Sequence, residues 1–120
     1  MVSRARRTAL VAGTVTSVAG ALLVTDPRRL GRPFGMEGRE PALRLIGVSD
    51  LVLAPGLLRG EPRWPWLAAR AAANAAVAAY LARVAPDTGA PGAVRATAAA
   101  MAALTVVDGT AGLTLRRAER

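Results

Sequence analysis

Residues 8–25 read TALVAGTVTSVAGALLVT, an apolar run in which no side chain is charged. A helix over this run would be about 27 Å long, close to the thickness of the hydrocarbon core of a bilayer. A helix of a soluble bundle normally carries a polar stripe, and this run has no charged face. The run therefore favours a transmembrane helix.

Three further apolar segments follow, and arginine, glycine or proline separates each from the next. The third of the four segments has Trp64 and Trp66 at one end and Tyr80 near the other, where interfacial aromatic residues are typical. We expect an all-α fold, a four-helix transmembrane bundle with short loops, in a single integral membrane domain over residues 1–120. The expected helices are 8–25, 43–58, 64–84 and 94–115.

Two alternatives to this fold stay open. The basic start and the small residues Ala19, Gly20 and Ala21 also fit a cleaved signal peptide. A mean hydropathy of +0.32 also fits a soluble or surface-lying helical bundle. The charged, glycine-rich connector at 26–41 is expected to lie partly on a membrane surface, through Arg28, Leu30, Phe34 and Met36.

Composition narrows the function classes. All 16 basic residues are arginine, the net charge is +8, and the chain contains neither cysteine nor histidine. Disulfides, thiol chemistry, the usual zinc sites and imidazole catalysis are therefore excluded. No phosphate-binding loop or metal-ligand spacing is present, so we predict that the protein is not an enzyme and holds no cofactor or metal. The arginines lie at the ends of apolar segments, so nucleic acid is not an expected partner.

The arginine distribution also predicts an orientation. Four crossings place both termini and the middle loop on one side, with Arg4, Arg6, Arg7, Arg59, Arg63, Arg116, Arg117 and Arg120. The other side has Arg28, Arg29, Arg32 and Arg39, with Arg44, Arg83 and Arg95 near the boundary. The positive-inside rule then favours cytoplasmic termini in the cytoplasmic (inner) membrane.

Three ionisable residues interrupt the apolar segments at a similar depth. Asp50, Arg70 and Asp108 lie about 12, 9 and 11 Å from the same end of the expected bundle. An isolated charge in hydrocarbon costs at least ~2.5–3.5 kcal/mol, so such groups are expected to turn inward and pair. We expect Arg70 to bridge the two aspartates, with Asn74 adding a hydrogen bond one turn deeper. Alternatives are that Arg70 reaches the headgroups, or that Asp108 lies at the interface.

Asp50 is the most deeply placed of these groups. Pro55 removes an amide donor one turn later, so a kink is expected beside the aspartate. Two carboxylates facing one guanidinium leave a negative charge in excess, so we expect Asp50 to hold a proton and Asp108 to stay ionised.

Small residues predict close helix packing in the bundle. Ala9, Gly13, Ser17 and Ala21 recur every four residues on the first helix and suggest its packing face. On the last helix Thr105, Asp108 and Gly112 share one face, which we expect to point inward.

The segments RLIGVSDLVLAPGLL (44–58) and RWPWLAARAAANAAVAAYL (63–81) resemble a group of small four-helix integral membrane proteins of high-GC bacteria, grouped as a domain of unknown function. The resemblance covers about a third of the chain and implies a membrane location without an activity. Many members have Glu and Asp where this chain has Asp50 and Asn74. The matching positions here are Arg44, Gly47, Asp50, Gly56, Trp66, Arg70 and Asn74.

Two function classes follow from the sequence. The first is a structural or accessory multi-pass membrane protein in which the charged layer fixes helix register. The alternative is a small proton-linked transporter that uses Asp50. The lipid bilayer is the expected partner, and association with a second copy or with a membrane partner protein is left open. A dry, fully paired layer would favour the first class, and a cavity beside Asp50 the second.

Overall fold

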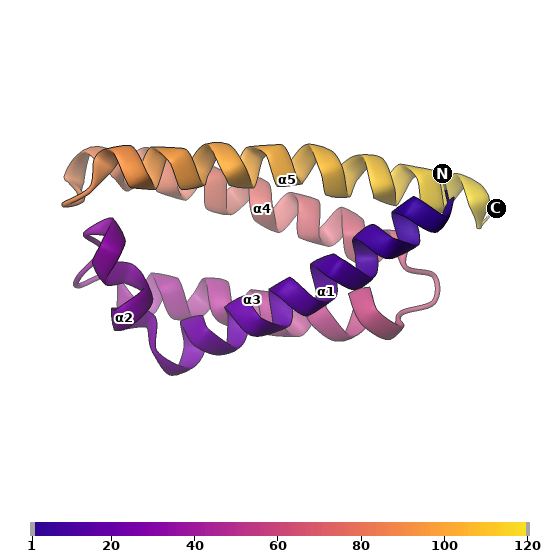
Figure 1. Cartoon of the computed structure of the whole chain (residues 1–120), viewed down its shortest axis with the longest axis horizontal. Coiled ribbons are helices and arrows are strands. Elements are labelled where there is room, and N and C mark those ends of the chain that lie inside the picture. Colours follow the sequence, from indigo (N-terminus) through magenta and orange to yellow (C-terminus); the bar gives the residue numbers. More distant parts are fainter. Residues whose placement is uncertain (1, 120) are drawn as a thin grey trace.

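The structure is a computed structural model that describes residues 2–119, and within them it contains α- and 3₁₀-helices and no strand. Four helices are long and one is short (Figure 1). The long helices have 24, 20, 21 and 28 residues and are α1 (Val2–Thr25), α3 (Glu40–Arg59), α4 (Trp64–Val84) and α5 (Pro91–Ala118). The short elements are α2 (Pro27–Gly31) and the 3₁₀ turns η1 (Arg32–Phe34) and η2 (Ala85–Asp87).

Prolines mark the beginnings of the helices. Each of α2, α3, α4 and α5 has a proline at its first or second position, where no intrahelical amide donor is required. Asp26 caps α2, since its side chain accepts a hydrogen bond from the Arg29 amide at 3.4 Å. Helix α4 has the bounds expected from the sequence, whereas α1, α3 and α5 extend beyond their apolar segments into the arginine-bearing flanks.

The long helices form two pairs. Helix α1 packs along α3, and α4 packs along α5. The pairs converge at the end of the molecule where both chain termini lie, and they diverge toward α2 (Figure 1). A glycine contact brings α1 and α3 together, because a Cβ atom on Gly20 would lie 2.9 Å from the carbonyl oxygen of Gly47.

The packing face of α1 differs from the expected one. Ala9 and Gly13 are buried, but Ala21 is exposed and Ser17 is only half-buried. An α-helix has 3.6 residues per turn, so a strict four-residue spacing drifts around the helix, whereas mixed steps of three and four stay on one face. The buried residues follow the mixed spacing and are Ala5, Ala9, Ala12, Gly13, Thr16 and Gly20.

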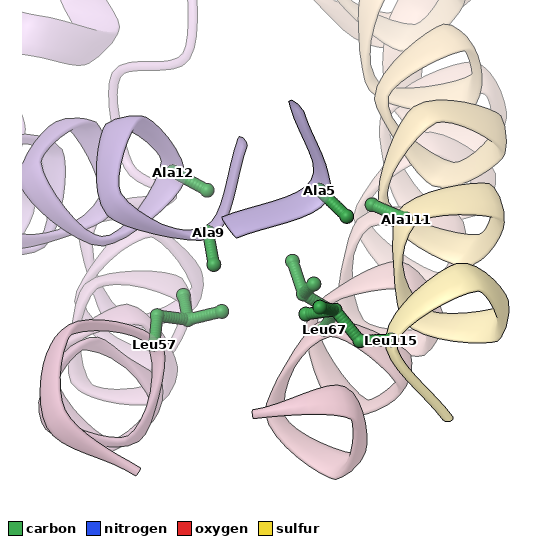
Figure 2. Close-up of a cluster of buried hydrophobic side chains, with 7 residues drawn as sticks. All are labelled: Ala5, Ala9, Ala12, Leu57, Leu67, Ala111 and Leu115. Carbon is green, nitrogen blue, oxygen red and sulfur yellow. The ribbon is translucent and has the colours of Figure 1, made fainter. Parts of the chain in front are cut away.

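Two apolar clusters join the helix pairs, one at each end. The terminal cluster lies where the pairs converge, and its side chains from α1, α3, α4 and α5 point toward one another (Figure 2). It consists of Ala5, Ala9, Ala12, Leu57, Leu67, Ala111 and Leu115. The connector cluster lies at the opposite end and consists of Met36, Leu43, Leu81, Val84, Ala85, Val94 and Ala98.

The connector between α1 and α3 folds over the open end of the bundle. Met36 is buried in the connector cluster and Phe34 packs against it, so these side chains face inward. The expectation that they lie on a membrane surface is therefore wrong. The Gly89 amide donates to the Gly35 carbonyl at 3.2 Å and ties the connector to the α4–α5 turn. Gly35 has a φ of 63°, and a Cβ atom there would overlap the Gly89 backbone.

Three of the described helices are long and apolar enough to cross a membrane: α1, α3 and α5. The fourth expected span, α4, is not among them. Arg70, Asn74 and Arg83 lower its hydropathy, and most of its other residues are alanines, which are only weakly hydropathic. Length and hydropathy thus support three membrane spans, whereas the four apolar segments led us to expect four.

Candidate functional site

A polar cluster lies between α1, α4 and α5. Arg70 on α4 forms an ion pair with Asp108 on α5, between Nη1 and Oδ2. The Asn74 amide nitrogen donates to the same oxygen at 2.9 Å. Arg70 Nε donates to the hydroxyl of Thr16 on α1 at 2.8 Å. All four side chains are buried, so the cluster links three helices through directional bonds in the interior.

Helical spacing explains why these groups meet. Arg70 and Asn74 are one turn apart on the inward face of α4, and Asp108 and Gly112 occupy the facing side of α5. Thr105, one turn before Asp108, donates its hydroxyl to the Ala71 carbonyl at 3.3 Å. The inward face expected for α5 is therefore present in the structure.

One oxygen of the ion pair has no partner. Asp108 Oδ2 accepts from both Arg70 and Asn74, whereas Asp108 Oδ1 is buried without a hydrogen bond within residues 2–119. Asp108 is only 1% exposed. Its charge is therefore balanced almost entirely by Arg70, since a buried carboxylate without such a partner is strongly disfavoured.

Asp50 lies outside this cluster. The structure gives Arg70 a different second partner, Thr16, and in the described chain Asp50 makes neither a hydrogen bond nor an ion pair through its side chain. A common depth places groups in one layer but does not set the lateral distance between them. Here α3 packs mainly along α1 rather than α4, so Asp50 is held beside Gly20. The bridge from Arg70 to both aspartates is absent.

Pro55 lies inside α3, which continues through it to Arg59. The proline ring is exposed, and it removes the amide that would bond to the Leu51 carbonyl. A kink at this position stays a prediction.

A cavity of about 620 Å³ opens beside the cluster, between the two helix pairs. Its walls are largely apolar and come from all four long helices and from the connector. Asp50, Arg70 and Asn74 are its strongly polar lining residues, with the hydroxyls of Thr14, Thr16 and Thr97. An apolar pocket with a few convergent polar groups is the usual form of a small-molecule site.

The cavity and Thr16 could not be identified from the sequence. Thr16 is one of several hydroxyl residues in an otherwise apolar helix, and nothing in the sequence distinguishes it from Thr14 or Ser17. The cavity depends on the angle between the helix pairs and on the inward turn of Leu30, Phe34 and Met36. Within residues 2–119 no group of three or more acidic residues is placed to hold a metal ion.

Both glycines of the 44–58 segment have a steric role. Gly56 lies directly beneath the indole of Trp66, and a Cβ atom there would overlap the ring. Gly47 forms the close approach to Gly20. These contacts hold the end of α3 against the start of α4 and the middle of α3 against α1.

No known protein-family model, characterised protein or solved structure matches this chain.

Proposed function

We propose that this chain is a four-pass integral membrane protein whose polar cluster holds the helices in register. The observation that carries the proposal is the outer surface of the long helices, which presents large apolar side chains where a soluble protein would present polar ones. These exposed residues lie on α1, α3 and α5 and are Val2, Leu10, Val11, Val15, Val18, Leu22, Leu45, Val48, Leu51, Val52, Val106, Val107 and Leu113.

The charges support the same placement. Asp50, Arg70 and Asp108 are the acidic or basic residues of the described chain that lie away from helix ends, and they face the cavity or each other. Other charged side chains of the described chain lie in loops or near helix ends. This division between an apolar belt and charged ends is the one that a bilayer requires.

Helix α4 is proposed as the fourth span in spite of its lower hydropathy. Its polar residues Arg70 and Asn74 are buried, and between Trp66 and Arg83 its exposed residues are all alanine. Its 21 residues would extend about 31 Å, and it packs alongside α5. The surface that lipid would meet is thus free of charge between Trp66 and Arg83.

Alkaline carbonate extraction tests membrane integration. An integral protein remains in the pellet and needs detergent for release, because its apolar belt has no aqueous alternative. A chain that is released by carbonate and stays monomeric in buffer without detergent would contradict the proposal and favour the soluble bundle.

We place both termini in the cytoplasm, at the inner membrane. The end of the bundle that carries the termini includes Arg4, Arg6, Arg7, Arg59, Arg63, Arg116 and Arg117. Arg120, also counted toward this side, lies outside the described residues. Arg116 lies over the Trp64 ring, 5.1 Å from its centroid, as an arginine–aromatic pair at a membrane interface would.

A proton-linked transporter is the second candidate, and the cavity is the observation that favours it. Asp50 lines the cavity without a side-chain partner, whereas the Arg70 cluster is internally bonded. A carboxyl in that position can alternate between a proton and a cationic ligand. The test measures the uptake of cationic solutes into proteoliposomes under an imposed pH gradient. A gradient-driven flux that disappears in Asp50→Asn supports transport, and no flux for any cationic solute favours the structural role.

A further inference from the structure

The cavity has one lining carboxyl group, that of Asp50, without a side-chain partner in the described chain. Of its lining residues in the described chain, only Asp50 and Arg70 are ionisable, and Arg70 is already bonded to Asp108 and Thr16. Asp108 is buried behind Arg70 and does not line the cavity. A ligand entering the cavity therefore meets, among apolar walls, a carboxyl group that has no side-chain partner in the described chain and that can give up its proton to pair with a cation. In such surroundings an ion pair is much stronger than in water, because little solvent screens it.

We propose that this cavity binds an organic amine with a bulky apolar body, whose ammonium N–H donates to the Asp50 carboxylate. The proposal rests on the proposed membrane placement of the helices and names the ligand class for the transporter alternative. The cavity's 620 Å³ lies within the range of sites for drug-sized molecules. Its lining of Leu, Val, Ile, Met and Phe side chains suits an apolar body.

The aromatic content distinguishes a protonated amine from a quaternary ammonium ion. Quaternary ammonium groups cannot donate a hydrogen bond and are typically held by several aromatic faces. Phe34 is the one aromatic residue among the lining residues described, and it packs against the connector cluster. Recognition therefore depends on the carboxylate and on N–H donation.

The cavity also has a route of entry. Thr14, Val15, Val18 and Leu22 both line it and are exposed, and all four lie on α1. Its mouth therefore runs along α1, within the apolar belt. An amine with a large apolar body partitions into a bilayer and can enter from the lipid side.

A matched set of adamantane probes tests the ligand class. The protein is reconstituted in phosphatidylcholine nanodiscs, and binding of 1-aminoadamantane, 1-adamantanol and trimethyl(1-adamantyl)ammonium is measured by equilibrium dialysis against empty nanodiscs. We expect saturable binding of the amine, and binding of the other two that is weaker by about tenfold or more, since each lacks a charge-assisted hydrogen bond. Equal binding of the amine and the alcohol overturns the proposal, as does saturable binding of none.

Variants locate the binding. Asp50→Asn should weaken amine binding by about tenfold or more, and Val77→Phe should weaken it by narrowing the cavity one turn from Asn74. The matched controls are Glu37→Gln, an exposed carboxylate outside the cavity, and Ala76→Phe, on the outer face of α4. Amine binding that is unchanged in Asp50→Asn overturns the proposal, whatever Val77→Phe shows. If Asp50→Asn does not fold, Val77→Phe and the probe series still decide.

The two proposals can fail separately. A chain that does not insert into nanodiscs contradicts the membrane placement, and the ligand proposal with it. A chain that inserts and binds no amine contradicts the ligand class alone.

Discussion

Arg70 on α4 and Asp108 on α5 form a buried ion pair, with the two side chains 8% and 1% exposed. The pair joins the two helices in the half of the bundle nearer the chain termini, and Thr16 extends it to α1. Because both side chains are buried, each charge depends on the other. The stability of the bundle should therefore respond strongly to the loss of one partner and less to the loss of both.

Removal of either partner alone tests this dependence. Arg70→Met and Asp108→Leu should each lower the free energy of unfolding by about 3–5 kcal/mol, because a buried charge is left uncompensated. The double variant should lose less than the sum of the two, since it leaves no unpaired charge. Denaturant titration in detergent measures the free energy of unfolding of the unsubstituted protein, the two single variants and the double variant. Additive losses would show that the two residues are not coupled.

The Thr16 hydroxyl is expected to contribute through its bond to Arg70. Thr16→Val keeps the shape of the side chain and removes the acceptor of a charged donor, which should cost about 1.5–3 kcal/mol. Thr14→Val is the control, since that hydroxyl donates to the Leu10 carbonyl of its own helix. Thermal unfolding followed by circular dichroism compares the two, and an equal effect would argue against the Arg70–Thr16 bond.

The amide of Asn74 should not be replaceable by a carboxylate. Asn74→Ala removes one donor to Asp108 and should destabilise the protein by about 1–3 kcal/mol. Asn74→Asp should destabilise it more at neutral pH, because it places a second negative charge beside Asp108 without a proton to donate. Denaturant unfolding of both variants at the same pH gives the order of their stabilities. If Asn74→Asp were the more stable, the bond from Asn74 to Asp108 would not form as described.

The close approach of α1 and α3 is expected to require Gly20. A Cβ atom there would lie 2.9 Å from the Gly47 carbonyl oxygen and 3.0 Å from Asp50 Cβ, so Gly20→Ala should cost about 1–3 kcal/mol. Gly109→Ala is the matched control in α5, where an added Cβ meets nothing within 4 Å. That variant should be neutral or stabilising by up to about 1 kcal/mol. A stabilising effect of Gly20→Ala would contradict the packing.

Local patterns predicted the helices, because hydropathy and the prolines and glycines between segments act over a few residues. They also placed Asp50, Arg70 and Asp108 in one layer, with Asn74 one turn deeper, since depth follows from position along a helix. They did not show which groups meet in that layer. Arg70 bonds to Thr16 rather than Asp50 because α1 packs beside α3 and the helix pairs diverge, and this arrangement is set by long-range packing.

The cavity, likewise, could not be predicted from a single sequence. It requires Leu30, Phe34 and Met36 to turn inward, whereas the same apolar residues in a charged connector also fit a membrane surface. The Gly35–Gly89 hydrogen bond that ties the connector to the α4–α5 turn joins residues far apart in the chain.

The central claim is that α4 crosses the bilayer with the other three long helices, and the position of two loops tests it most directly. The chain has no cysteine, so Glu61→Cys and Asp87→Cys each introduce a single thiol, on either side of α4. Both sites are exposed in the structure. With a membrane-impermeant maleimide on vesicles of known orientation, the account predicts labelling of the two positions from opposite faces, with Ala118→Cys on the same face as Glu61→Cys. Labelling of positions 61 and 87 from the same face would contradict it.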